Sequence, residues 1–163
     1  MGNTYSKPLS WLPTEGREAD LDFALNKGLY NGKRIFIHYS NQEGITAIIN
    51  AGLKISDVRR NETRNGSSAG IYLCPSTHTF NPDNVFNLLF LGNDRYHDRG
   101  DWVIVFAWTP PSEESLKDEI VTQGSFAREL IYTGGEVDIL RADVIYVGRN
   151  PFVDVFETDS PLL

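Results

Sequence analysis

The sequence is poor in cysteine, in long apolar runs and in positive charge. Its only cysteine, Cys74, cannot form an internal disulfide or a thiolate metal cluster, and its apolar neighbours at residues 71–73 indicate a buried, unreactive thiol. No apolar run approaches the roughly 18 residues that a membrane-spanning helix needs, so we expect a soluble chain. The 15 Lys and Arg against 22 Asp and Glu give a net charge of −7. A surface of this sign repels phosphate backbones, which disfavours nucleic acid as a partner or acceptor.

Two nucleotide-binding signatures are also missing. The sequence contains neither G-x-G-x-x-G nor G-K-[ST], which argues against Rossmann-type hydride transfer and against P-loop phosphoryl transfer. It has no internal repeat and no low-complexity tract. Its 163 residues suit one compact domain. We expect an arm and a short helix over residues 1–30, followed by the main domain over residues 31–163.

Hydrophobic periodicity predicts short helices between strands. Ser40 and Glu43 form a capping box, with Ser40 as N-cap, before a helix that presents Ile45, Ile48 and Ile49 on one face and stops at Gly52. The other expected helices cover residues 20–29 and 84–91. Strands are expected at 33–39, 69–73, 102–108, 128–133 and 144–147, with loops at 56–68, 92–101 and 109–125. This mixed order favours an α+β fold with a two-sheet core over a doubly wound sheet.

Residues 1–6 match the acceptor pattern for N-myristoylation. The pattern needs Gly after Met1 and Ser or Thr at position six, which Gly2 and Ser6 supply, and Lys7 adds a base. Chance agreement is the alternative interpretation. One myristoyl chain gives only marginal, reversible membrane binding. We therefore expect a cytoplasmic protein that can associate peripherally with membranes through a lipidated Gly2.

Polar side chains stand at the ends of three apolar segments. His38, Tyr39 and Ser40 stand at the far end of the strand at residues 33–39, Tyr72 lies within Gly-Ile-Tyr-Leu, and Glu129 precedes Leu-Ile-Tyr. Each has an ordinary structural alternative: a hydrogen-bonded histidine, a helix cap at Ser40, a core tyrosine, or a glutamate on an edge strand. Three such positions far apart in sequence can nevertheless meet in one cleft.

In this order and spacing, the three segments resemble the ADP-ribosyltransferases of the H-Y-[DE] type. This family includes the poly(ADP-ribose) polymerase catalytic fold and the HYD1-type toxin and effector domains. His38-Tyr39-Ser40 is similar to the family's His-containing strand end, the segment from Gly70 to Leu73 to its G-[IV]-Y-[FL] strand, and the segment from Arg128 to Tyr132 to the strand with the catalytic acid. The resemblance covers residues 35–147. It implies an ADP-ribosyltransferase-like split two-sheet β core with flanking short helices.

The resemblance also implies how NAD would be bound. His38 would hydrogen-bond the adenine-side ribose, and the Tyr39 backbone with the Ser40 hydroxyl would hold the nicotinamide amide. Tyr72 would stack on the nicotinamide ring, within the NAD-binding segment that Gly70 opens. A second stacking wall would come from Phe80 or Phe86, between which the sequence does not decide.

Glu129 would carry the chemistry. Cleavage of the bond to nicotinamide leaves a ribosyl group with oxocarbenium character, which a nearby carboxylate stabilises. Glu136, beside Gly135, is the competing acid, and Glu129 is favoured because it precedes an apolar triplet.

The resemblance implies an NAD-dependent mono-ADP-ribosyltransferase that needs no metal and transfers to a macromolecule, with protein favoured as the acceptor. Tyr39 stands where the polymerase branch has glycine, which favours the toxin-like, mono-transferring branch. The alternatives are an NAD glycohydrolase and a catalytically silent interaction module. Arg59, Arg60 and Arg64 are candidates for the NAD pyrophosphate, although a solvated loop face is the simpler interpretation. The sequence names neither the acceptor nor an antidote protein.

Overall fold

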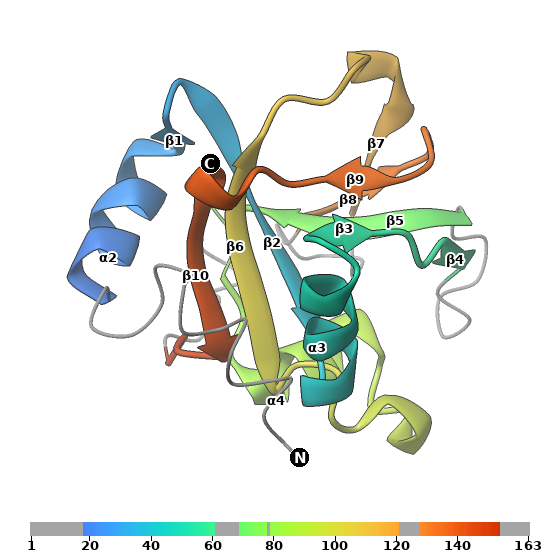
Figure 1. Ribbon diagram of the computed structural model, residues 1–163. Coiled ribbons are helices and arrows are strands. Elements are labelled where there is room, and N and C mark those ends of the chain that lie inside the picture. The colour runs from blue at the N-terminus through green and yellow to red at the C-terminus, as the bar shows by residue number, and fades with distance from the viewer. Residues whose placement is uncertain (1–17, 61–68, 78, 121–127, 154–163) are drawn as a thin grey trace.

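A computed structural model describes residues 18–60, 69–77, 79–120 and 128–153 (Figure 1). These residues form a mixed α+β fold, in which antiparallel strands build the main sheet and a few short helices flank it. Gly2, Ser6, Lys7 and Arg64 lie outside the described residues, as does most of the predicted N-terminal arm. Within the described residues, no helix has the length and apolar character needed to cross a bilayer.

The elements follow the predicted order closely. The helices are α2 (Glu18–Lys27), α3 (Gln42–Asn50) and α4 (Pro82–Asn84), which continues into a π-helical turn (Val85–Leu89). The long strands are β2 (Lys33–Ser40), β5 (Ala69–Pro75), β6 (Trp102–Trp108), β7 (Leu116–Ile120), β8 (Arg128–Tyr132) and β10 (Val144–Arg149). Two-residue strands are β1 (Leu29–Tyr30), β3 (Lys54–Ile55), β4 (Arg59–Arg60) and β9 (Val137–Asp138). Short 3₁₀ turns cover Asp94–Tyr96, Glu113–Ser115 and Arg141–Asp143.

Three expectations need correction. The cap of α3 is Asn41, whose side chain accepts the Gly44 N–H at 2.8 Å, and not Ser40. Residues 59–60, expected in a loop, form β4 beside β5. Residues 116–120, expected in an acidic connection, form β7, because pairing with β8 satisfies the backbone of this charged segment.

The main sheet has the strand order β10-β6-β2-β5-β8-β7, and β3 pairs with β9 separately. β2 pairs with β6 from Arg34 to Ser40. With β5 it pairs only at two positions, Phe36 with Pro75 and Ile37 with Cys74. Beyond Ile37 the two strands diverge, and β5 runs across the direction of β2, β6 and β10 (Figure 1). The sheet is therefore bent at the junction of β2 and β5.

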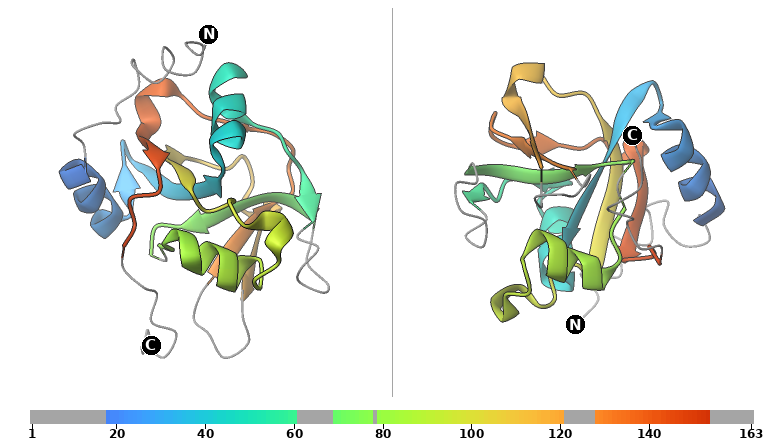
Figure 2. Two further views of the ribbon diagram at one scale, coloured as in Figure 1. Left: turned by 90° about the horizontal axis from the view of Figure 1, so that it is seen from below. Right: turned by 180° about the vertical axis from the view of Figure 1, so that it is seen from behind.

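Buried side chains gather on both faces of the sheet. The α3-side core contains Phe36 of β2, Ile104 of β6 and Leu73 of β5, packed under the apolar face of α3. The α2-side core contains Ile37, Tyr39, Cys74 and residues of α2 and of the segment after β5. Figure 2 shows β2, β6 and β10 between the two helices. Because each buried side chain belongs to one of these two cores, its strand neighbours can be assigned to a face of the sheet.

Candidate functional site

His38 lies where β2 leaves β5. Its ring is half-buried, and its Nδ1 lies 2.8 Å from the backbone oxygen of Tyr72. Because a carbonyl only accepts hydrogen bonds, Nδ1 must carry the proton. This contact fixes the orientation of the ring.

Tyr72 and Glu129 lie on neighbouring strands and on the same face of the sheet. β5 and β8 pair Tyr72 with Ile131 and Leu73 with Leu130. Leu73 and Leu130 belong to the α3-side core, so Tyr72 and Glu129 point to the opposite face. Continued by one residue, the register makes them diagonal neighbours, which ordinarily lie about 7–8 Å apart.

The Glu129 side chain is buried, with 5% of its surface exposed. Glu136, the competing acid, is exposed after the turn at Gly134 and Gly135. A buried carboxylate interacts more strongly with a charge that develops beside it than an exposed one does. The difference in burial favours Glu129 over Glu136 as a chemical group.

Side chains alternate along β2, so His38 leaves the strand on the face opposite to that of Ile37 and Tyr39. Ile37 and Tyr39 point into the α2-side core, so His38 begins on the face of Phe36. β2 and β5 no longer pair at His38, and its imidazole ring contacts the Tyr72 backbone oxygen. The structure thus joins His38 to the Tyr72 main chain, and it places Tyr72 and Glu129 on one face.

Ser40 is buried and is not the cap of α3. A Cβ added at Gly44 would come within 2.0 Å of the Ser40 Oγ, so Gly44 leaves the space that this hydroxyl occupies. With Asn41 as the cap, helix capping no longer explains why a hydroxyl stands at position 40.

The side chain of Tyr39 is a feature that sequence reasoning missed, since only its backbone was assigned a role. Its ring makes edge contacts with Phe80 and Phe152, at centroid distances of 6.0 and 6.3 Å. Its hydroxyl accepts the Phe80 N–H at 2.8 Å. Burial raises the pKa of this phenol well above its usual value, and Cys74 and Glu129 raise it further. The hydrogen bond from the Phe80 N–H lowers the pKa but does not offset the increase. The burial of Tyr39 could have been predicted from the sequence, because Ile35, Ile37 and Tyr39 alternate and therefore lie on one face of the strand.

The two candidate stacking rings differ in burial. Phe80 has no exposed surface and packs in the α2-side core, so its ring offers no free face to a ligand in this structure. Phe86, on the π-helical turn, is partly exposed. Of the two predicted positions, Phe86 is the one with a surface that a ligand could meet.

Gly70 is required by strand packing. A Cβ at this position would lie 2.6 Å from both the Ile131 Cγ2 and the Tyr132 backbone oxygen. Residues 59–60 of β4 pair with Gly70 and Ala69, so this arginine pair runs beside the strand that carries Tyr72.

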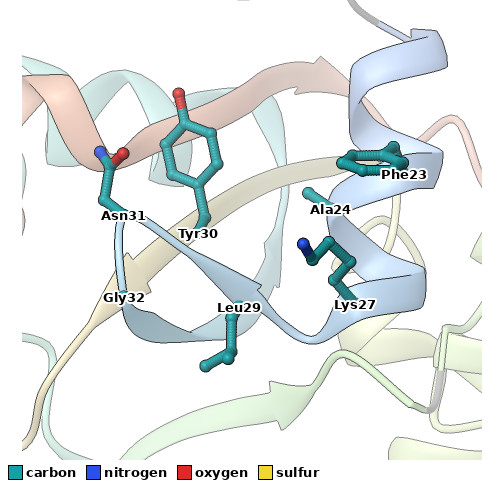
Figure 3. Close-up of a pocket in the computed structure, with 7 residues that line it drawn as sticks. All are labelled: Phe23, Ala24, Lys27, Leu29, Tyr30, Asn31 and Gly32. Carbon is teal, nitrogen blue, oxygen red and sulfur yellow. The ribbon is translucent and has the colours of Figure 1, made fainter.

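A separate cavity of about 470 Å³ lies between α2 and β1 (Figure 3). Phe23, Ala24 and Lys27 of α2 form one wall, and the β1 turn from Leu29 to Gly32 forms the other. None of the predicted site residues lines it. The cavity is therefore separate from the proposed NAD site.

Within the described ranges, no group of three or more His, Cys, Asp or Glu side chains is arranged to hold a metal ion. The structure joins the His38 ring to the Tyr72 backbone oxygen, and it places the side chains of Tyr39, Tyr72, Cys74 and Glu129 on one face of the sheet. Comparison of the chain with protein-family models, curated proteins and solved structures finds no match.

Proposed function

We propose that this protein is an NAD-dependent mono-ADP-ribosyltransferase that modifies a protein acceptor and releases nicotinamide. One observation carries the proposal. The buried Glu129 carboxylate shares a face with Tyr72, while His38 is hydrogen-bonded to the Tyr72 carbonyl where β2 leaves β5. This arrangement suits a slot that holds both ends of a dinucleotide.

The bend of the sheet supports the proposed ADP-ribosyltransferase-like core. A split two-sheet core needs two groups of strands that meet along a short stretch and then separate. β2 and β5 pair at only two positions and then diverge, and His38 and Tyr72 stand beside this separation.

The proposed reaction breaks the bond between the ribose C1′ and the nicotinamide nitrogen. The bonding electron pair moves to the pyridinium ring, which leaves as neutral nicotinamide, and positive charge develops on the ribose. Glu129 would stabilise this charge as it forms, because a preorganised carboxylate in a buried site needs little reorganisation. A nucleophilic side chain of the acceptor then bonds to C1′ and loses its proton to solvent.

The proposal is tested by incubating the full-length protein and a cell lysate with NAD labelled in its adenylate half. Label on a protein band, absent with Glu129→Gln, supports transfer. Free ADP-ribose without labelled protein would instead indicate an NAD glycohydrolase. No consumption of NAD above the Glu129→Gln background would leave the silent interaction module as the correct interpretation.

A further inference from the structure

The cavity between α2 and β1 is formed where the helix ends in a tight turn. Gly28 has a φ of 73°, and its N–H donates to the Ala24 oxygen at 2.8 Å, which ends α2. The chain then enters β1, so the last turns of the helix and the strand line one cavity (Figure 3). At about 470 Å³, this cavity has the size of an ordinary small-molecule site.

The β1 wall of the cavity is held in place by contacts outside it. Asn31 and Gly32 have positive φ angles of 54° and 76°, as in the type I′ turn of a two-residue hairpin. The Asn31 amide donates to the Ala142 oxygen at 3.3 Å and to the Asp143 carboxylate at 3.0 Å. A ligand therefore meets a preformed wall, which lowers the entropy lost on binding.

The side chains that line the cavity are aromatic and apolar, with one cation. Phe23 of α2 and Tyr30 of β1 supply rings, and Phe23 and Leu29 are 65% and 50% exposed. Lys27 extends from α2 toward β1, and its Nζ lies 5.4 Å from the Phe23 ring centroid (Figure 3). Among the described residues, no hydrogen bond or ion pair engages the Lys27 amino group. An occupant that covers these apolar surfaces therefore also meets a positive charge that no carboxylate neutralises.

We propose that this cavity binds a small aromatic carboxylate, whose ring packs against Phe23, Leu29 and Tyr30 and whose carboxylate pairs with the Lys27 ammonium. A single lysine suits a single negative charge, whereas a phosphate group carries nearly two charges and three strong acceptor oxygens. The net charge of −7 further disfavours highly charged anions, because the whole chain repels them. No residue of the proposed NAD site lines the cavity, so the inference goes beyond the proposed function and does not depend on it.

The test is an NMR titration of the ¹⁵N-labelled full-length protein with naphthoate and with its neutral amide of nearly the same shape, naphthamide. Backbone signals of residues 23–32 should shift saturably with naphthoate, at a Kd of about 1 mM or below. Lys27→Gln should weaken naphthoate binding about 2- to 5-fold, the range for one exposed ion pair, and leave naphthamide binding unchanged. Lys54→Gln, which removes an exposed cation outside the cavity, should change the binding of neither probe.

A second pair of variants tests the apolar wall. Phe23→Ala should weaken the binding of both probes about 2- to 10-fold, because both carry a ring that packs on Phe23. Leu140→Ala is the matched control, since Leu140 is 62% exposed and lies outside the cavity, and it should weaken neither. No saturable shift in residues 23–32, or an equal loss of both probes in Lys27→Gln, would overturn the inference.

Discussion

Gly70 shows how single residues set the geometry of the site. A methyl group there would strike the β8 backbone at the Tyr132 oxygen, which a strand can relieve only by moving. Tyr72 lies two residues further on and pairs with Ile131 of the same strand. The glycine of the Gly-Ile-Tyr-Leu segment thus permits the close approach of β5 and β8, the strands that carry Tyr72 and Glu129.

Asp101 offers a pH-dependent test at this scale. Partial burial, and then the neighbouring Asp98, raise its pKa, while His97 and Arg149 oppose the shift. The fold therefore favours the protonated carboxyl, and its contribution to stability is full below the unfolded pKa of about 3.9 and is lost as pH rises through the raised value.

Because Asp101 is exposed and solvent screens its charge, Asp101→Asn, which stays neutral, should raise Tm at pH 7 by no more than about 1–2 °C. The difference should vanish near pH 3, where Asp101 is protonated in both states. Thermal unfolding followed by circular dichroism at the two pH values measures this. A lower Tm for the variant at pH 7 would contradict the assigned direction of the shift.

The start of α3 can be tested as an element. Asn41 accepts the Gly44 N–H, and its amide also donates to Asp98 at 3.3 Å. Asn41→Ala should therefore lower the free energy of unfolding by about 1–2 kcal/mol. Ser40→Ala is the comparison variant and should lower it by less than Asn41→Ala does, because Ser40 does not cap the helix. Equal effects in urea denaturation would return the capping role to Ser40.

The sequence predicted the elements that have a clear apolar pattern. β6 is a continuous β-branched and aromatic run, and α3 has three isoleucines on one face, so both were predicted. β7 was missed because its sequence, Leu-Lys-Asp-Glu-Ile, is rich in charge, as befits a strand at the edge of the sheet order. The two-residue strands have too few residues for any period. Ser40 and Asn41 are both good caps, and backbone geometry alone decides between them.

At the scale of the whole molecule, the site depends on the junction between β2 and β5. Sequence order alone predicted which strands carry His38, Tyr72 and Glu129. It could not predict the contact of the Tyr39 hydroxyl, because its hydrogen-bond partner, the Phe80 N–H, belongs to a distant segment of the chain. Contacts between distant segments depend on register, which the residues themselves do not reveal.

A partly buried ion pair connects the hairpin of β1 and β2 to the turn before β10. Lys33 binds the buried Asp143 carboxylate, which also accepts a hydrogen bond from Asn31 at 3.0 Å. Lys33→Met should destabilise the protein by about 1–3 kcal/mol, because it leaves a buried carboxylate without its cation. Adding Asp143→Asn should recover part of this loss in denaturant unfolding.

The control for the ion pair is Lys54→Met. Lys54 pairs with Asp138 at 3.9 Å, and both side chains are exposed. Its loss should change stability by less than about 0.5 kcal/mol. If Lys33→Met and Lys54→Met lower the free energy of unfolding equally, the Lys33–Asp143 ion pair does not stabilise the protein more than an exposed pair does.

Nicotinamide release from NAD by wild type, Glu129→Gln and Glu136→Gln tests most directly whether the buried carboxylate beside Tyr72 is the chemical group of an NAD site. Both variants replace a carboxylate by an amide of nearly the same shape, one buried and the other exposed. We predict that Glu129→Gln lowers kcat at least about 100-fold, in the range for loss of one electrostatic stabiliser, while Glu136→Gln keeps the wild-type rate. Equal rates for wild type and Glu129→Gln, or loss of activity only in Glu136→Gln, would contradict the account.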